Sequence, residues 1–193
     1  MVKNTYDDHG RRVTQRYYDT DGETPIVSSK YHCIGYEYSY DERGNQTYIW
    51  YIEPDEAIAV HSGLNLLNYV IYDDYYHIVW NAYYIWDDDE YILVPRKDFG
   101  YAATENVYEG TLWVQTLYLD ENEQPVINQG EGYAILTREF NDMWQLIRVS
   151  YYDEAEELTE CKTGYAVIEY EYDESGNESN WIYSDALGEP VAW

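Results

Sequence analysis

The sequence is poor in basic residues and in long apolar runs, and each shortage disfavours a class of protein. Only 11 of its 193 residues are Lys or Arg, against 38 Asp or Glu, which gives a formal net charge of −27. Such a charge disfavours direct binding to nucleic acid or to an anionic membrane. No segment approaches the roughly 18 apolar residues of a membrane span, and the first residues, MVKNTYDDHG, lack the apolar run of a signal peptide. We expect a cytoplasmic chain as given, or a surface or secreted one if it is a fragment of a larger protein.

Cysteine, phenylalanine and methionine are also scarce, at two residues each. Cys33 and Cys161 are too few to make a disulfide framework. In an elongated array they would lie too far apart to pair. The chain nevertheless has 26 Tyr and 7 Trp, and aromatic side chains bury large areas, which excludes a disordered acidic tail. Tyrosine tolerates half-burial because its hydroxyl can stay in water, so a thin sheet suits this composition.

Aromatic residues eleven positions apart recur along the chain. The best-preserved copy is YDESGNESNWIYSDALGEPV, residues 172–191. The pairs are Tyr6 and Tyr17, Tyr40 and Tyr51, Tyr72 and Tyr83, Tyr108 and Tyr118, Phe140 and Tyr151, and Tyr172 and Tyr183. Their first members lie 34, 32, 36, 32 and 32 residues apart, and the ten-residue spacing of the fourth pair indicates a one-residue deletion. A period of about 33 residues predicts a single domain of tandem repeats over residues 1–193.

Each copy alternates in a way that is typical of half-buried strands. In CIGYEYSYD, residues 33–41, the side chains of Ile34, Tyr36, Tyr38 and Tyr40 fall on one face. DESGN and DERGN are expected to form tight turns, and DALGEP and DTDGETP a second kind of turn. Residues 57–72 are the one segment that would also suit a helix, and we favour a strand there. We predict an all-β fold, in which tandem antiparallel β-hairpin repeats form an elongated twisted sheet or a solenoid-like array.

The pattern YDESGN followed by YSDALGEPV, with Gly-Tyr-Ala between other copies, resembles tandem Tyr/Gly-rich β-hairpin repeats of large proteins from anaerobic Gram-positive bacteria. It is similar in style to the YD repeats of RHS proteins, to WG and MORN repeats and to choline-binding hairpins. The match is best at residues 172–191 and continues in degraded form over the chain. The resemblance implies a β-rich array used for binding or spacing, without catalysis. It names no ligand, and the aromatic-cage spacing of choline-binding repeats is not reproduced.

No motif in the chain points to catalysis, a metal or a cofactor. The four histidines lack metal-ligand spacing, and Asp19-x-Asp21-Gly22 fails as a calcium loop because its twelfth position is Lys30. The cluster Asp87, Asp88, Asp89 and Glu90 suits a cation or a basic partner, although a solvated loop is the favoured interpretation. Repetition gives every copy equivalent acids, so no carboxylate pair is distinguished. We expect no enzyme, no cofactor and no metal site.

Two functions remain open, and they differ in the surface used. The first is a non-enzymatic module that binds a protein or a glycan through aromatic side chains. Its candidate residues are Tyr36, Tyr38, Trp50, Tyr170 and Trp181. The second is an acidic mimic of nucleic acid, of the phage anti-defence type, that blocks the positively charged groove of a nucleic-acid-binding protein. Its candidate residues are Asp73, Asp74, Asp87, Asp88, Asp89, Glu90, Glu154, Glu156, Glu157, Glu169 and Glu171.

The two functions differ in how binding responds to salt. Charge mimicry should weaken steeply as salt rises, whereas aromatic binding should change little. A small basic cluster, Arg11, Arg12 and Arg16, is also open to two interpretations. It docks on an acidic neighbour or it caps the array, and we favour the cap.

Overall fold

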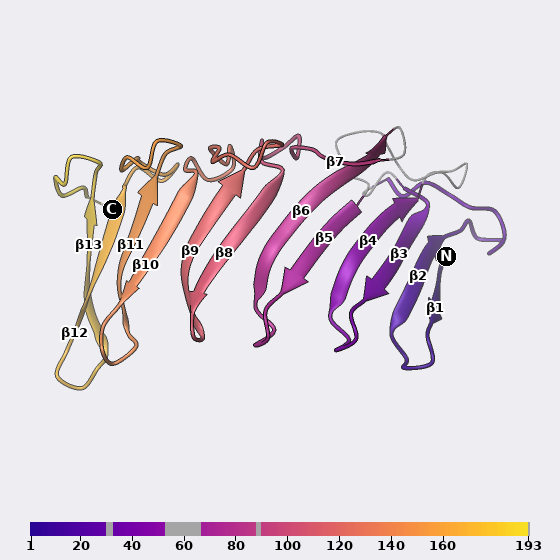
Figure 1. The fold of residues 1–193 in the computed structure, drawn as a ribbon, viewed down its shortest axis with the longest axis horizontal. Helices are drawn as coiled ribbons and strands as arrows, with labels where there is room; N and C mark the ends of the chain where they lie inside the picture. The colour runs from indigo at the N-terminus through magenta and orange to yellow at the C-terminus, as the bar shows by residue number, and fades with distance from the viewer. Residues whose placement is uncertain (30–32, 53–66, 88–89, 193) are drawn as a thin grey trace. The chain divides into compact units, whose positions relative to one another are not determined.

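The computed structural model describes residues 1–29, 33–52, 67–87 and 90–192. The chain forms two compact units, residues 1–97 and 98–193, and each is described by itself. In the described residues every regular element is a strand (Figure 1), so the all-β prediction is confirmed. No helix in these residues is long and apolar enough to cross a membrane.

Both units are antiparallel meanders in which consecutive strands are neighbours. The first unit contains β1 (Val2–Tyr6), β2 (Arg12–Tyr17), β3 (Gly35–Tyr40), β4 (Gln46–Ile52), β5 (Leu67–Tyr72), β6 (Ile78–Asp87) and β7 (Glu90–Leu93). The second contains β8 (Ala103–Glu109), β9 (Leu112–Leu119), β10 (Ile135–Phe140), β11 (Leu146–Tyr152), β12 (Val167–Tyr172) and β13 (Glu178–Ser184). Of the segment 57–72, residues 67–72 form a strand, as favoured, and residues 57–66 lie outside the described residues. The insertion after the third pair adds β7, which pairs with the end of β6.

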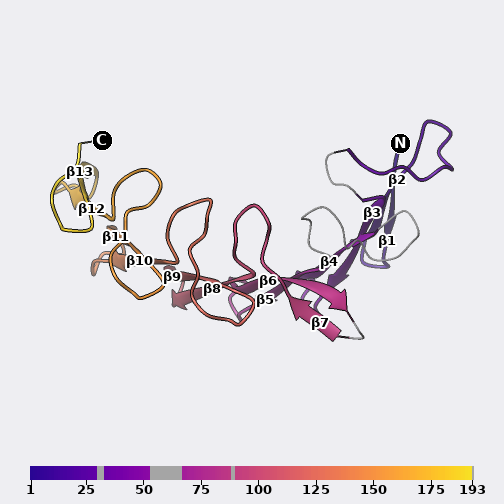
Figure 2. The same ribbon diagram turned by 90° about the horizontal axis from the view of Figure 1, so that it is seen from above.

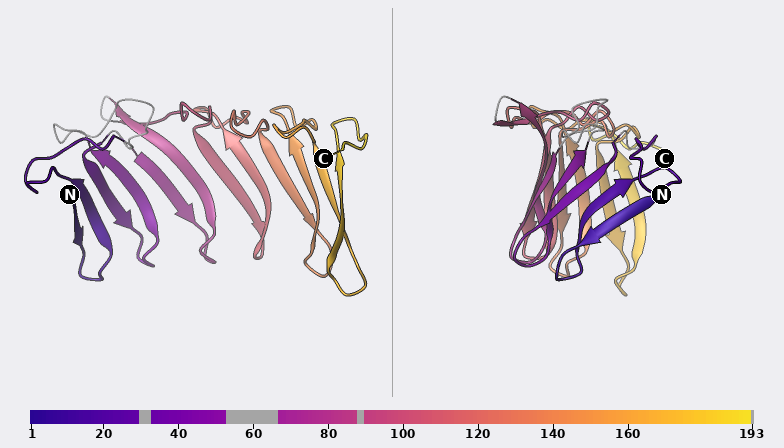
Figure 3. Two further views of the ribbon diagram at one scale, coloured as in Figure 1. Left: turned by 180° about the vertical axis from the view of Figure 1, so that it is seen from behind. Right: turned by 90° about the vertical axis from the view of Figure 1, so that its right-hand side faces the viewer.

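Each aromatic pair lies on the two strands of one hairpin. Within each unit the tight turns of these hairpins lie at one end of the strands and the longer connections at the other (Figures 1 and 3). Every one of these hairpins contains a register shift just after its turn. In the last hairpin Tyr172 pairs with Glu178 and Glu171 with Asn180, so Ser179 is skipped. This β-bulge changes the alternation by one residue. It therefore returns Tyr183 to the face that carries Tyr172, which explains the eleven-residue spacing.

The fourth hairpin has the same bulge but a shorter turn. Glu109 pairs with Leu112, which leaves Gly110 and Thr111 as a two-residue loop. The one-residue deletion indicated by the sequence thus lies in the turn and not in a strand, and the facing of the tyrosines is preserved.

The two kinds of turn expected from the sequence are in most copies one and the same structure. In the best-preserved hairpin the Asp173 N–H donates to the Asn177 carbonyl at 2.8 Å, and Asp173 Oδ1 accepts the N–H groups of Ser175 and Asn177. Asp185 repeats this arrangement with Leu187 and Glu189 at the opposite end of the strands. The same turn also begins at Asp7, Asp41, Asp73, Asp120, Asn141 and Asp153. It is a tight turn followed by one left-handed residue, which suits the twist of a hairpin.

Copies that lost the turn glycine keep its conformation. Glycine fills the left-handed position in the best-preserved turns, with φ of 81° at Gly176 and 82° at Gly188. The residues that replace it also have positive φ: Tyr76 (70°), Glu123 (60°), Trp144 (64°) and Glu156 (62°). The left-handed conformation has a steric free-energy cost for any residue with a Cβ. The hydrogen bonds of these turns and the pairing of their strands therefore hold the residues in it.

A ladder of tyrosine rings crosses the strands on one face of each unit, which we call the ladder face. In the second unit the ring centres of Tyr133 and Tyr151 are 4.7 Å apart, those of Tyr151 and Tyr165 5.9 Å, and those of Tyr165 and Tyr183 4.9 Å. Tyr118 and Tyr101 extend the series. The ladder alternates between the second tyrosine of each pair and the tyrosine of each Gly-Tyr, so it joins successive repeats.

The core of the second unit lies on the ladder face, where buried residues pack against the tyrosine rings, and Figure 2 shows the connecting loops leaving the plane of the strands. Leu136, Val149 and Ile168 come from neighbouring strands, and Cys161 comes from a connecting loop. Burial raises the pKa of Tyr133 and of Tyr151 well above the ordinary value. These hydroxyls therefore stay neutral and serve packing and hydrogen bonding.

The first tyrosine of a pair ties its hairpin to the preceding one. The Tyr40 hydroxyl donates to the Arg12 carbonyl at 2.7 Å, Tyr72 to the Gln46 carbonyl at 3.1 Å, and Tyr172 to the Leu146 carbonyl at 2.7 Å. Each acceptor lies at or near the start of the second strand of the previous hairpin. The recurrence of tyrosine at this position thus has a structural cause.

Replacing a strained turn residue by glycine should stabilise the protein. For Glu123→Gly we expect a gain of about 1 kcal/mol in the free energy of unfolding, because Gly takes a positive φ without a steric cost. Urea unfolding of the purified chain measures it. Glu121→Gly removes the same charge two residues earlier, where φ is not positive, and should give no gain. Equal stabilisation by both variants would assign the effect to charge and not to backbone strain.

Candidate binding surfaces

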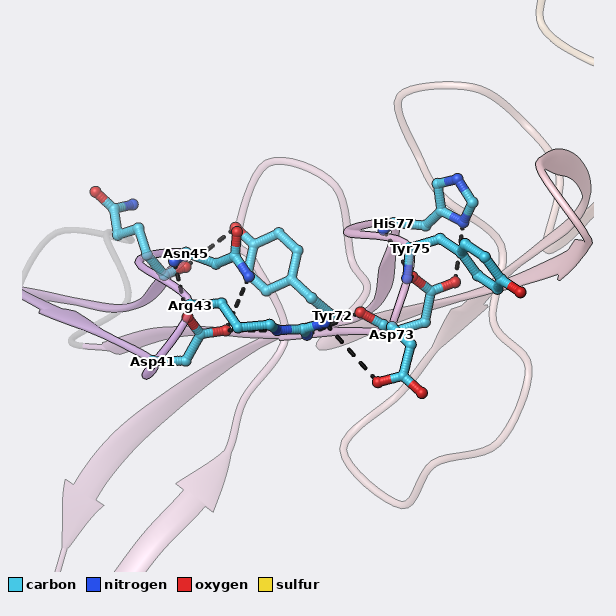
Figure 4. Close-up of polar contacts among 9 residues, drawn as sticks. Asp41, Arg43, Asn45, Tyr72, Asp73, Tyr75 and His77 are labelled. Atoms are coloured by element: carbon cyan, nitrogen blue, oxygen red, sulfur yellow. Dashed lines mark hydrogen bonds and ion pairs between the residues drawn. The ribbon is translucent and has the colours of Figure 1, made fainter.

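The turn ends of β3–β4 and β5–β6 form a polar cluster around Arg43 (Figure 4). Its guanidinium donates to the Asp73 carbonyl at 2.8 Å and lies 3.8 Å from the Asp74 carboxylate. The same group sits 4.9 Å above the ring centre of Tyr76. Arg43 therefore links two successive turns. In the second unit Gln145 plays the same part by donating to the Gly176 carbonyl at 3.1 Å.

The turn carboxylates are held ionised by their own turns. The pKa of Asp173 lies below its ordinary value because its carboxylate accepts hydrogen bonds from Asn177 and Ser175. Hydrogen bonds from Thr24 and Glu23 likewise lower the pKa of Asp21 to about 2. At Asp73 partial desolvation acts in the opposite direction, but hydrogen bonds from His77 and Tyr75 outweigh it, and the pKa is lowered. Each shift has a local, structural cause.

An aromatic patch covers the reverse face of the first unit, the face opposite the ladder. Strand alternation places Tyr48 and Trp50 there, and Tyr69 lies directly across from Tyr48. The ring centres of Tyr48 and Tyr69 are 4.6 Å apart with planes at 16°, and those of Tyr48 and Trp50 are 5.0 Å apart at 15°. Tyr84 continues the patch at 6.5 Å from Tyr69. The three stacked side chains are half-buried, so the patch remains accessible to a partner.

Tyr91 lies at the border of this aromatic patch on β7. It is 48% exposed and pairs with Trp86 in the β6–β7 register, which places it on the same face as Tyr84. Burial raises the pKa of Tyr48, and the neighbouring Tyr69, Tyr91 and Tyr84 raise it further. The ion pair between Arg16 and Glu37, 2.9 Å apart, lies on the same face, with Glu37 opposite Trp50 in the register. An apolar centre beside charged groups is the usual composition of a protein-binding surface.

Two turns carry large apolar side chains into solvent. Tyr75 and Tyr76 are 69% and 58% exposed on the β5–β6 turn, and Met143 and Trp144 are 70% and 64% exposed on the β10–β11 turn. These are the two hairpin turns in which an aromatic residue replaced the left-handed glycine. The loss of glycine can be seen in the sequence, but only the structure shows that the side chains that replace it are exposed.

The aromatic residues proposed from the sequence fall in different surroundings. Tyr36 is buried in the ladder face between Tyr17 and Tyr51, and Tyr38 beside it lies under the guanidinium of Arg12 at 4.5 Å. Trp50 belongs to the aromatic patch of the reverse face. Tyr170 and Trp181 meet edge to face at 6.5 Å, and Trp181 is 54% exposed. The remaining patch residues, Tyr48, Tyr69, Tyr84 and Tyr91, were missed, although Tyr48 alternates with Ile49 in the same phase as Trp50.

The acidic residues proposed from the sequence are dispersed over several turns and strands. Asp73 belongs to its turn, Asp74 is fully exposed beside Arg43, and Glu90 is exposed at the start of β7. Glu154, Glu156 and Glu157 share one turn at the loop end. Glu169 pairs with Arg148 at 3.2 Å, and Glu171 accepts a hydrogen bond from Asn180 at 3.1 Å. Asp87 ends β6, and Asp88 and Asp89 lie outside the described residues.

The net charge is unequally divided between the units. Residues 1–97 hold 8 basic and 17 acidic residues, a net −9, whereas residues 98–193 hold 3 and 21, a net −18. Several of the basic groups stack on aromatic rings, among them Arg11 on Tyr40 and Arg138 on Trp113. Arg138 lies 3.9 Å from the Trp113 ring centre, and burial lowers its pKa.

Within the described residues, no group of three or more His, Cys, Asp or Glu side chains has the placement of a metal site. Cys33 and Cys161 are both free and buried. His77 lies 2.9 Å from Asp73 at a turn, whereas His32 and His61 lie outside the described residues.

Comparisons with known proteins give distant similarities to solved structures. No family model matches the chain, and no curated protein matches it. A solved structure of TcdB2-TccC3-TEV is 13% identical with a TM-score of 0.40, and covers 95% of this chain and 10% of that one. The Photorhabdus luminescens Tc holotoxin pore is 11% identical with a TM-score of 0.31, over 95% and 11% of the two chains. The chain thus spans about a tenth of the length of these proteins.

The turn carboxylates should make stability depend on pH at the acid end. Asp173 has a pKa below 3.8 in the folded protein, so its contribution is complete above that value and is lost as pH falls through the folded pKa. Asn141 makes the same backbone hydrogen bonds in another copy, so Asp173→Asn should keep the turn. We expect the wild type to be more stable than this variant at pH 7 and the difference to shrink as pH falls below 3.8 and through the lowered folded-state pKa. Urea unfolding across this range measures it, and a difference that is constant with pH would contradict the assignment.

Proposed function

We propose that this chain is a non-enzymatic interaction module that binds a protein partner through the aromatic patch on the reverse face of its first unit. The observation that carries the proposal is the accessible stack of Tyr48, Trp50 and Tyr69, with Tyr91 at its border. Tyr and Trp dominate the binding energy of protein interfaces because they bury large areas at a small entropic cost. Here they sit on a sheet face whose backbone is fixed by pairing on both sides.

The non-enzymatic part of this proposal is supported by the origin of the shifted pKa values. The carboxylates with lowered pKa values lie in turns, and turn hydrogen bonds explain the shifts. The tyrosines with raised pKa values lie mainly in the ladder and the aromatic patch. A catalytic site would concentrate such shifts in one cleft. Their repetition from turn to turn favours a structural role.

We also infer that the repeats are of the Tyr/Gly hairpin type, similar in style to YD repeats. The support is the recurring Asp turn and the two structural roles of the paired tyrosines, one in the ladder and one in the hydroxyl bond to the preceding hairpin. Both roles require a tyrosine at the same position in each repeat, which is the feature that defines this type of repeat.

The acidic-mimic function stays a second hypothesis, and salt separates it from the first. Exposed charges attract a basic groove only while the salt concentration is low, because the screening length falls from about 10 Å at 0.1 M to about 3 Å at 1 M. Aromatic contacts are much less sensitive to salt. One binding experiment can therefore test both.

The experiment compares the wild-type chain with patch variants as bait for soluble host proteins. Trp50→Ala and Tyr91→Lys should each weaken retention of the same partner by about tenfold or more, since aromatic hot spots contribute at least 1–2 kcal/mol. Trp181→Ala, which removes an exposed tryptophan from the second unit, is the matched control and should bind like the wild type. Circular dichroism confirms that the variants remain folded.

The outcomes are distinct. Partner retention that survives high salt and is lost in the patch variants supports the proposal. Retention that is lost in high salt but unchanged in the variants would favour the acidic mimic instead. Binding of a glycan that depends on the patch would correct the class of ligand.

A further inference from the structure

The first and last strands, β1 and β13, each pair with only one other strand among the described residues, β1 with β2 and β13 with β12. The outer edge of β13 is bridged only at its end, by the Ser184–Pro190 pair and by the Val191 N–H that donates to the Tyr183 carbonyl. Every residue of β1 is exposed, as are the first four residues of β13. Unpaired strand edges present N–H and C=O groups that readily accept another strand.

The contacts between successive hairpins show which residues such an added strand would use. At the junctions inside each unit, the residue two before the second tyrosine of a pair lies opposite the residue four before the first aromatic residue of the next pair. Val149 faces Ile168 in this way, Thr116 faces Leu136, and Gln15 faces Tyr36. Trp181 holds the first of these positions in β13, two residues before Tyr183. Val2 holds the second in β1, four residues before Tyr6.

We propose that copies of this chain associate head to tail, with β1 of one copy added antiparallel to the free edge of β13 of another, so that Val2 lies opposite Trp181. The pairing would repeat the junction that joins hairpins inside each unit. It uses surfaces that are separate from the aromatic patch, and so does not rest on the proposed function.

The apolar side chains at the two edges fit this pairing. At the internal junction Val149 and Ile168 are only 6% and 8% exposed, whereas Val2 and Trp181 are 52% and 54% exposed. A hollow of about 630 Å³ beside β13 is lined by Trp181, Tyr183, Pro190 and Val191, among others. A strand added at this edge would cover Trp181 and place Val2 against the hollow.

The backbone of β1 is aligned for the same contact. Met1 and Tyr18 exchange both of their backbone hydrogen bonds across the β1–β2 pair. In an antiparallel ladder the residues with inward and outward groups alternate, so the N–H and C=O of Val2 point away from β2. They are therefore available to a strand on the outer side.

The charges of the two edges favour pairing of β1 with β13 over pairing of two β1 edges or of two β13 edges. Residues 2–17 contain four basic residues (Lys3, Arg11, Arg12 and Arg16) and two acidic ones, a net +2. Residues 167–184 contain five acidic residues (Glu169, Glu171, Asp173, Glu174 and Glu178) and no basic one, a net −5. Two β13 edges would repel each other, as would two β1 edges, whereas the unlike edges attract.

The proposed register also places individual charges in a favourable order. Inside the second unit Arg148 lies between Glu139 and Glu169, at 3.8 Å and 3.2 Å. By the same register Lys3 of one copy would lie opposite Asn180 of the other. Glu171 pairs with Asn180 from the far side, on β12, so it would lie two strands from Lys3 on the same face. Lys3 already extends along this face, where its ammonium lies 4.8 Å from the Tyr18 ring centre.

Sedimentation velocity of the 193-residue chain tests the proposal from about 1 µM to about 1 mM, a range that covers weak contacts. A head-to-tail contact uses two different surfaces, so the species should grow in a series from dimer to trimer and beyond. High salt should shift this series towards monomer. A chain that stays monomeric throughout, or that stops at a dimer, would overturn the proposal.

Variants identify the edges. Val2→Pro removes the outward N–H, and Lys3→Glu reverses the edge charge, so each should raise the concentration needed for association by about tenfold or more. Glu171→Lys should do the same, and the double variant Lys3→Glu with Glu171→Lys should restore association because the charges are exchanged. Trp113→Ala, far from both edges in the sequence, should associate like the wild type. Failure of the double variant to recover while it stays folded, or association of Val2→Pro at wild-type concentrations, would contradict the register.

Discussion

The structure depends on the packing of tyrosine rings from one hairpin against those of the next. A single two-stranded hairpin cannot bury its own apolar face and is marginal in water. In this chain neighbouring hairpins cover each other's face: Tyr118 packs against Tyr133 of the next hairpin and Tyr151 against Tyr165, and Leu136, Val149 and Ile168 are buried beside them on the same face. Stability is then shared between repeats and the contacts between them, as in other repeat proteins. Tyrosine suits this thin sheet because one end of the ring packs while the hydroxyl bonds or stays in water.

The turn and the bulge keep this ladder in phase. Because each hairpin skips one residue after its turn, both tyrosines of a pair emerge on the same face. A turn shortened by one residue, at Gly110 and Thr111, leaves that relation intact, since the skipped residue remains. The left-handed turn position survives even where glycine is absent, as at Tyr76 and Trp144. Turn sequence thus drifts more freely than the facing of the tyrosines, which explains why paired aromatics are the most visible trace of the repeat.

The fold could be predicted from the sequence because period-two alternation and a fixed 32–36-residue step survive in all copies. Two features could not. The two kinds of turn have the same structure because a carboxylate or amide oxygen accepts two backbone N–H groups in each. Asp120 and Asn141 do this in turns that lack the glycine by which the motif is recognised. The aromatic patch arises from residues on four strands, β4 to β7, and only Trp50 was selected, because rings on the two faces of a sheet look alike in composition. Whether residues 1–193 act as one domain stays a prediction.

Native-state hydrogen exchange on Tyr151→Ala tests most directly whether the ladder holds successive hairpins together. The ring of Tyr151 contacts Tyr133, next to β10 of its own hairpin, and Tyr165 of the following hairpin, while Tyr133 in turn contacts Tyr118 of the preceding hairpin. If the ladder couples the repeats, removing this ring should lower the protection of backbone amides in β9, β10, β12 and β13 as well as in β11. A loss of protection confined to β11 and its immediate hydrogen-bond partners would contradict this account, and each hairpin would then be stable through its own turn and strand pairing.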